Sequence, residues 1–98
     1  MQKEIKRIEY QVMDELYGAK HYMEDAKFWK ESADHDEERS MDYSMICKKY
    51  EEMAKQELEH AKSLSMMLTR FKGKDPSIDM LVDFLVDINN EQISEAME

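Results

Sequence analysis

The fold is decided by residues 5–33, which read IKRIEYQVMDELYGAKHYMEDAKFWKESA. Through this stretch a stripe of side chains recurs at alternating steps of three and four residues, and all but one of its members are apolar. The stripe consists of Ile5, Ile8, Val12, Glu15, Ala19, Tyr22, Ala26, Trp29 and Ala33. Because this spacing places its members on one face of an α-helix, it predicts a single helix of about 30 residues, roughly 45 Å long.

A second stripe with the same spacing follows and predicts a helix of similar length. It consists of Tyr43, Ile46, Tyr50, Met53, Glu57, His60, Leu64, Met67 and Phe71. The stripe stops at Lys72-Gly73-Lys74, where a glycine and cations suit a helix C-terminus. Between the stripes, Asp34 and Glu37 have the spacing of a capping box, which predicts a tight turn over residues 33–38. Residues 1–72 are therefore expected to form an antiparallel helical hairpin.

The rest of the chain predicts a third helix. Residues 73–77 are expected to form a linker, because Pro76 suits the first turn of a new helix. Residues 77–98 then form that helix and a tail, with the helix running to about Ile88 or beyond; Asn89-Asn90 and the polar tail end it at a position that the sequence does not fix.

This third helix is apolar over most of residues 78–88, and its polar exceptions, Asp79, Asp83 and Asp87, follow one line at every fourth position. The line is interpreted as a solvated edge, with a secondary cation site as the alternative. A helix that is apolar on most sides is normally covered on most sides. A single hairpin offers only one surface, so further subunits are expected to cover the rest.

Composition limits the class of fold. The chain has 98 residues, which is one small domain spanning residues 1–98. Only two glycines and one proline are present, while 38% of the residues are charged. Such a composition is typical of long helices and argues against a β-rich fold. The expected fold class is all-α.

Charge limits the partners. The chain has 23 acidic against 14 basic residues, a formal net charge of −9, so nucleic acid and anionic lipid are not expected as partners and cations are. The polar N-terminus and short apolar runs predict neither a signal peptide nor a membrane span. With Cys47 as the single cysteine, these features favour a reducing, cytoplasmic location.

Three ionisable residues interrupt the two stripes: Glu15, Glu57 and His60. A carboxylate on a core seam needs a cation, a hydrogen-bond network or access to water. Glu57 and His60 are three residues apart, so their side chains leave neighbouring turns in one direction. Glu15 and Glu57 are equidistant from residue 36, the middle of the expected turn, which predicts that they lie at one level of the hairpin. Together the three form a candidate metal site.

One hairpin holds too few ligands to close such a site. Two hairpins related by a two-fold axis would form a four-helix bundle whose shared seam contains four glutamates and two histidines. That ligand set is the pattern of carboxylate-bridged di-iron and di-manganese bundles. Its oxygen-rich donors favour two iron ions per dimer, or manganese, with zinc or calcium as adventitious ions.

Two short motifs resemble a known family. Asp14-Glu15-Leu16, with Tyr22 seven residues after the glutamate, and Glu57-Leu58-Glu59-His60-Ala61 resemble the encapsulated ferritins and, more broadly, half of a rubrerythrin or ferritin, over about residues 10–70. The resemblance implies a ferritin-like four-helix bundle formed by two chains, with dimers assembling into a ring. It also implies an encapsulin shell as a storage compartment, although the family's docking peptide is not recognisable in residues 90–98.

The resemblance assigns roles to individual residues. It implies that Glu15 and His60 are terminal ligands, that Glu57 bridges the metals, and that Asp14 lies on the iron entry path. Tyr22 and Tyr50 share a level about 10 Å from the glutamates. They are interpreted as core residues, with electron relay as the alternative.

The expected function is that of a ferroxidase, an enzyme that oxidises Fe²⁺ with O₂ or peroxide at the dimer interface and serves iron handling or storage. Two alternatives are open. One is a non-catalytic acidic helical adaptor or oligomerisation protein, in which the polar seam residues fix the helix register. The other is a rubrerythrin-like peroxide reductase, for which a single cysteine cannot build the family's four-cysteine electron-delivery site.

Overall fold

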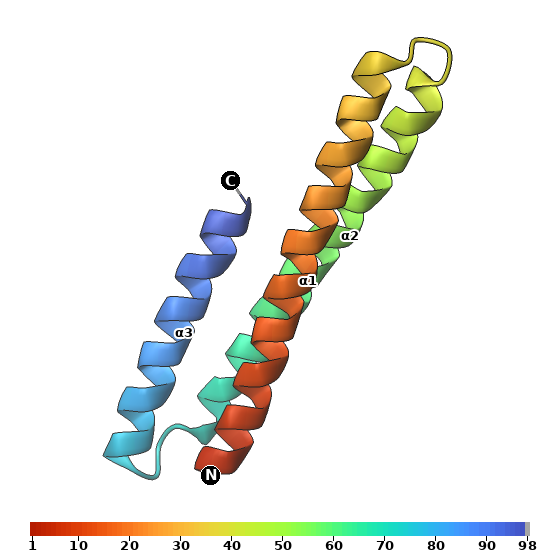
Figure 1. Cartoon of the computed structure of the whole chain (residues 1–98). Helices are drawn as coiled ribbons and strands as arrows, with labels where there is room; N and C mark the ends of the chain where they lie inside the picture. Colours follow the sequence, from red (N-terminus) through yellow and green to blue (C-terminus); the bar gives the residue numbers. More distant parts are fainter. Residues whose placement is uncertain (98) are drawn as a thin grey trace.

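The computed structural model describes residues 1–97, and these residues are helical apart from two short connections (Figure 1). The elements are α1 (Gln2–His35), α2 (Ser40–Met67), the short 3₁₀ helix η1 (Leu68–Phe71) and α3 (Pro76–Met97). The all-α prediction is confirmed, since residues 1–97 contain no strand. Nor does any helix within this range have the length and apolarity needed to cross a membrane.

Helices α1 and α2 form the long antiparallel hairpin in Figure 1, and aromatic contacts give its register. The ring centroids of Tyr22 and Tyr50 lie 6.1 Å apart, and those of Trp29 and Tyr43 lie 5.4 Å apart. The two members of each pair are equidistant from residue 36, as the sequence predicts. The predicted register of the hairpin is therefore confirmed.

Burial separates the residues of the hairpin into two rows. In α1 both rows belong to the predicted stripe, whereas in α2 the buried residues lie beside the predicted stripe, none of whose members is buried. The buried row recurs every seven residues and consists of Ile5, Val12, Ala19, Ala26 and Ala33 in α1, and Cys47, Ala54, Ala61 and Leu68 in α2. Alanine predominates here, and small side chains let two helices approach closely. The other row is only half-buried, and we call it the open face; it consists of Glu15, Tyr22, Trp29, Tyr43, Tyr50 and Glu57.

Helix α3 folds back along the half of the hairpin that contains the N-terminus, and the turn end of the hairpin extends beyond it (Figure 1). Its buried side chains join two apolar clusters. One cluster contains Ile5, Leu68, Ile78 and Val82, and the other contains Val12, Ala19, Leu58, Ala61 and Ile93. On the outer side of α3, Met80 is 74% exposed and Phe84 is 61% exposed. That further subunits cover this side of α3 stays a prediction.

Helix α3 continues through Asn89 and Asn90 to Met97, which gives the end that the sequence left open. Asn89 is fully buried, and its Nδ2 donates to Glu9 Oε1 at 2.6 Å and to Ser65 Oγ at 3.0 Å. A side chain normally favoured at helix ends is therefore used in the interior, where it ties α3 to both helices of the hairpin.

The predicted capping box at the hairpin turn is also wrong. Helix α1 runs through Asp34 to His35, so that Asp34 lies inside it. The carboxylate of Asp36 instead accepts a hydrogen bond from the backbone N–H of Arg39, at 3.2 Å, and α2 begins at the next residue, Ser40. Ala33, two residues before the end of α1, is buried, which accords with a helix that continues beyond the predicted start of the turn.

The linker before α3 is closed by two members of the predicted aspartate line. Asp79 Oδ1 accepts from the backbone N–H of Gly73 at 2.9 Å, and Asp83 pairs with Lys72. Gly73 has a φ of +104°, a conformation that glycine adopts at low cost. The hydrogen bond to Asp83 raises the pKa of the Lys72 ammonium. Asp79 and Asp83 of the predicted solvated edge therefore also hold the linker between η1 and α3 in place.

Replacing Asn89 tests the buried amide. The substitution Asn89→Ala removes two hydrogen bonds, leaves Glu9 without its donor, and creates a small cavity, so it should lower the free energy of unfolding by about 2 kcal/mol. Urea denaturation at a fixed protein concentration measures the change. The control is Asn90→Ala, at an exposed neighbouring position, which should change little. Equal midpoints for the two variants would show that the buried amide does not stabilise α3.

Candidate metal centre

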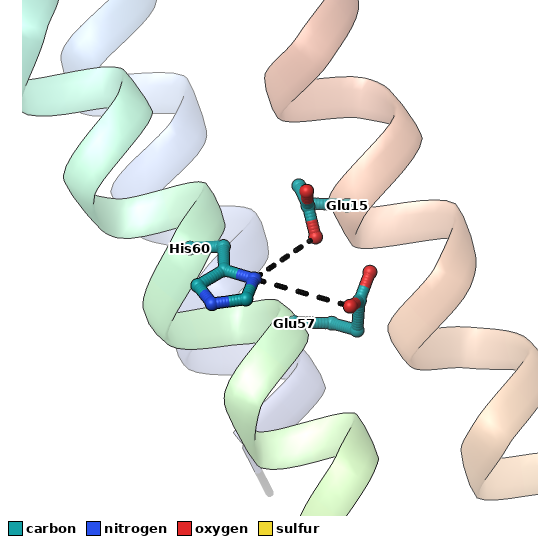
Figure 2. A group of neighbouring side chains, drawn as sticks. All are labelled: Glu15, Glu57 and His60. Atoms are coloured by element: carbon teal, nitrogen blue, oxygen red, sulfur yellow. Dashed lines mark ion pairs between the residues drawn. The ribbon is translucent and has the colours of Figure 1, made fainter.

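The structure brings Glu15 of α1 together with Glu57 and His60 of α2, as Figure 2 shows. One potential ligand atom from each residue lies within 4.8 Å of the others. His60 Nδ1 is 3.6 Å from Glu15 Oε2 and 3.9 Å from Glu57 Oε1. These separations are too long for hydrogen bonds. They are close to the roughly 3 to 3.5 Å expected between neighbouring ligands that each lie about 2.1 Å from one ion.

Local helix geometry explains why the three meet. Glu57 and His60 leave α2 one turn apart, and the hairpin register places Glu15 at their level. In Figure 2 α3 passes behind the hairpin while the three side chains lie in front. The candidate site is therefore on the open face, away from the core that α3 completes.

The carboxylates are more enclosed than the imidazole. The side chains of Glu15 and Glu57 are each 26% exposed, whereas that of His60 is 62% exposed. Glu15 Oε2 is buried and has no hydrogen-bond partner among residues 1–97. A buried carboxylate oxygen without a partner is costly. A cation held between the three residues would satisfy it, so this donor set fits a metal.

Electrostatics around Glu57 indicate the same need for positive charge. The pKa of the Glu57 carboxyl is raised by its hydrogen bond with Glu15, by burial and by the negative charge of Glu15, while His60 lowers it. Two neighbouring carboxylates repel each other when both are ionised. A divalent cation would remove that repulsion and favour the ionised form of both.

Gly18 also belongs to this site, although the sequence interpretation did not include it. A β-carbon built on Gly18 would lie 2.8 Å from Glu57 Oε2, closer than real β-carbons approach other atoms. The signal was present, because an isolated glycine inside a helical pattern is unfavourable and often has a packing reason. That Glu57 is the residue next to Gly18 could be found only from the packing of α2 against α1.

The predicted accessory residues lie around the cluster. Asp14 precedes Glu15 but is exposed, and the group of potential ligands does not contain it. Tyr22 and Tyr50 are half-buried and lie next to each other on the turn side of the site.

Comparison of the chain with protein-family models, with curated proteins and with solved structures gives no match. Function is therefore inferred from the site itself. Its two carboxylates and one imidazole offer hard oxygen ligands with one nitrogen, a donor set suited to iron or manganese and lacking the thiolates typical of structural zinc. Half of the coordination sphere of a six-coordinate ion would remain for water, for substrate or for a second chain.

The raised pKa of Glu57 predicts how the metal-free protein responds to pH. In the folded state the neutral acid is favoured, so the stability that Glu57 contributes is present below its ordinary pKa of 4.5 and is lost as pH rises through the folded-state pKa. Glu57→Gln, which mimics the neutral acid, should therefore melt at a higher temperature than the wild type at pH 7 in EDTA. The difference should disappear near pH 4.

Thermal unfolding followed by circular dichroism at both pH values measures this effect. The matched control is Glu59→Gln, at an exposed glutamate two residues further along α2, which should give no comparable gain at pH 7. A wild-type protein that is as stable as Glu57→Gln at pH 7 would contradict carboxylate repulsion at the site.

Proposed function

We propose that two copies of this chain pack open face against open face and bind two iron ions with Glu15, Glu57 and His60 of each copy, as a ferroxidase-type enzyme that oxidises Fe²⁺ with O₂ or peroxide. The observation that carries the proposal is the convergence of three ligand atoms within 4.8 Å, one of them a buried carboxylate oxygen that lacks a partner. A single chain leaves this group half exposed, and a second copy would enclose it.

Charge supports a pair of divalent cations. Two copies would bring four carboxylates to one seam, and their charge equals that of two divalent ions. The same ligands would also hold manganese, which is the second candidate metal. Zinc or calcium would bind only adventitiously, because zinc sites more often include thiolates and calcium prefers more oxygen ligands.

The residues of this chain would have distinct tasks. Glu15 and His60 would hold an ion from opposite helices as terminal ligands, and Glu57 would take the bridging position that the family resemblance implies. When bound, the two iron ions supply the two electrons that reduce O₂ to peroxide, or peroxide to water, with two protons taken up. The exposed His60 edge leaves a route by which Fe²⁺ and oxidant reach the site.

The open face also supports the proposed dimer. Its half-buried aromatic residues are Tyr22, Trp29, Tyr43 and Tyr50, and large half-buried aromatic side chains are frequent in protein interfaces. Because α3 packs behind the hairpin, it leaves this surface free for a second hairpin and a four-helix bundle. A molecule measuring 61 × 19 × 13 Å is too small to enclose a mineral. Storage of ferric iron would therefore need a larger ring and a separate cytoplasmic compartment, such as an encapsulin shell.

One observation favours a second candidate, the non-catalytic helical adaptor. Large apolar side chains are exposed away from the site, including Met41 at 78%, Met45 at 65%, Met80 at 74% and Phe84 at 61%. Methionine-rich exposed surfaces suit adaptable protein contacts. In that function the three polar residues would only fix the register between chains.

Substitution of the ligands separates the two candidates. Protein purified without chelator should contain iron or manganese, and Glu57→Ala should lose most of this metal and most of the Fe²⁺ oxidation rate, because four of the proposed ligands would remain for two cations. His60→Ala should impair both less severely, since it removes a ligand that can be neutral. Elemental analysis and the absorbance of ferric iron give the two readouts, with Glu59→Ala as the control.

A different result would favour the helical adaptor. If Glu57→Ala keeps the metal content of the wild type and lowers the stability of the metal-free protein by about 3 kcal/mol or more, the cost of breaking a buried ion pair, then the cluster is a structural network and the adaptor is the better description.

The assembly can be tested independently of activity. Sedimentation equilibrium at micromolar concentration should find a dimer or a larger even oligomer, and EDTA should shift it toward smaller species, because a shared ion stabilises only the assembled form. Tyr22→Lys on the open face should weaken the dimer, whereas Met80→Lys on the outer side of α3 should leave this contact intact. A folded monomer that persists with added Fe²⁺ under anaerobic conditions would contradict the shared site.

A further inference from the structure

Gly18 stands in the interior of the 34-residue helix α1, where glycine is less favourable than alanine. Backbone conformation does not require it, because Gly73 is the residue with a positive φ within the described part of the chain. The reason for a glycine at this position must lie in what surrounds its missing side chain.

The neighbour of that empty position is the carboxylate of Glu57, from the facing helix. A β-carbon at residue 18 would meet Glu57 Oε2 at 2.8 Å, Cδ at 3.6 Å and Cγ at 3.8 Å. The missing side chain thus leaves a notch in α1 that the Glu57 carboxylate fills.

The notch accommodates one oxygen of Glu57, and the other oxygen faces His60. With Oε2 held against α1, Oε1 is directed to His60 Nδ1, 3.9 Å away (Figure 2). A residue that holds a ligand in its binding orientation commonly affects metal affinity without contacting the metal.

We propose that Gly18 is a positioning residue of the metal site: its notch holds the Glu57 carboxylate where it can share a cation with Glu15 and His60. This inference rests on the proposed function, because it concerns the orientation of a ligand in that same site. It means that the site requires, in addition to the three ligands, that position 18 of α1 has no side chain.

The notch is a requirement of the site more than of the fold. The atoms that an added methyl group would meet are at the far end of a flexible side chain, so rotation of Glu57 is the least costly response. Gly18→Ala should therefore fold, with a melting temperature equal to or higher than that of the wild type because alanine favours the helix. Its effect should appear in metal binding.

Anaerobic titration with Co²⁺, followed by its visible absorption, provides a readout that does not depend on catalysis. The wild type should bind Co²⁺, and Gly18→Ala should bind it about 10- to 100-fold more weakly, as is usual when a ligand loses its orienting neighbour. Lys20→Ala, an exposed substitution in the same helix, is the matched control and should bind as the wild type does. The melting temperatures of the metal-free proteins are measured in parallel.

A second comparison shows whether Glu57 is the group that moves. In a Glu57→Ala background the added methyl meets no carboxylate, so Gly18→Ala should raise the melting temperature by more than it does in the wild-type background. Equal changes in the two backgrounds, or a loss of stability in both, would show that the notch does not serve Glu57 and would overturn the inference.

The outcomes separate this inference from the proposed function. If the wild type binds Co²⁺ and Gly18→Ala binds it equally well, the inference about Gly18 is wrong and the metal site stands. If the wild type binds no Co²⁺, the proposed function fails, and the inference fails with it.

Discussion

The rest of the structure depends on the close packing of α1 against α2 through a row of small side chains. Alanines at positions 19, 26, 33, 54 and 61 occupy the buried row with a period of seven residues, and a seven-residue period keeps the same faces in contact along both helices. Once this contact is made in one register, every other pair of facing residues is determined. The levels of Tyr22 with Tyr50, of Trp29 with Tyr43, and of Glu15 with Glu57 follow from one packing choice.

This register of the two helices is electrostatically unfavourable at the level of Glu15 and Glu57. Two carboxylates meet, one of their oxygens is buried without a partner, and the pKa of Glu57 is raised by its hydrogen bond with Glu15, by burial and by the charge of Glu15. Other levels of the same face are occupied by neutral aromatic pairs, Tyr22 with Tyr50 and Trp29 with Tyr43. A pair of glutamates on this face is unfavourable for the isolated hairpin, and such an arrangement is understandable where a cation compensates it.

Helix α3 completes the core on one side only, and this asymmetry gives the hairpin two different faces. Its apolar contacts and the buried amide of Asn89 join it to the side of Glu9 and Ser65. The site lies on the other side, where it can receive a metal and a second chain. The proposed bundle therefore needs no rearrangement of α3, since the surface that a second hairpin would cover is already free.

The presence of three helices, the hairpin register and the meeting of Glu15, Glu57 and His60 could be predicted from the sequence. A seven-residue repeat is a local property of the chain, and its phase on both sides of one turn is enough to align the two helices. Local signals were less reliable where tertiary contacts compete with them. Asp34 and Glu37 have capping spacing, yet α1 continues through Asp34 to His35. Asn89 is of a residue type favoured at helix ends, yet buried partners hold it inside α3.

Which residues of the hairpin are buried followed from the tertiary structure alone, because in α1 both halves of the stripe have the same spacing and in α2 the buried row lies beside the predicted stripe. Burial depends on contacts between residues far apart in the sequence, between α1 and α2 along the hairpin and with α3 along the half that contains the N-terminus. The tertiary structure likewise placed the Glu57 carboxylate of the facing helix where a side chain at residue 18 would lie. The sequence identifies the three candidate ligands, and the packing of the helices gives them a common face, a buried oxygen without a hydrogen-bond partner and a notch.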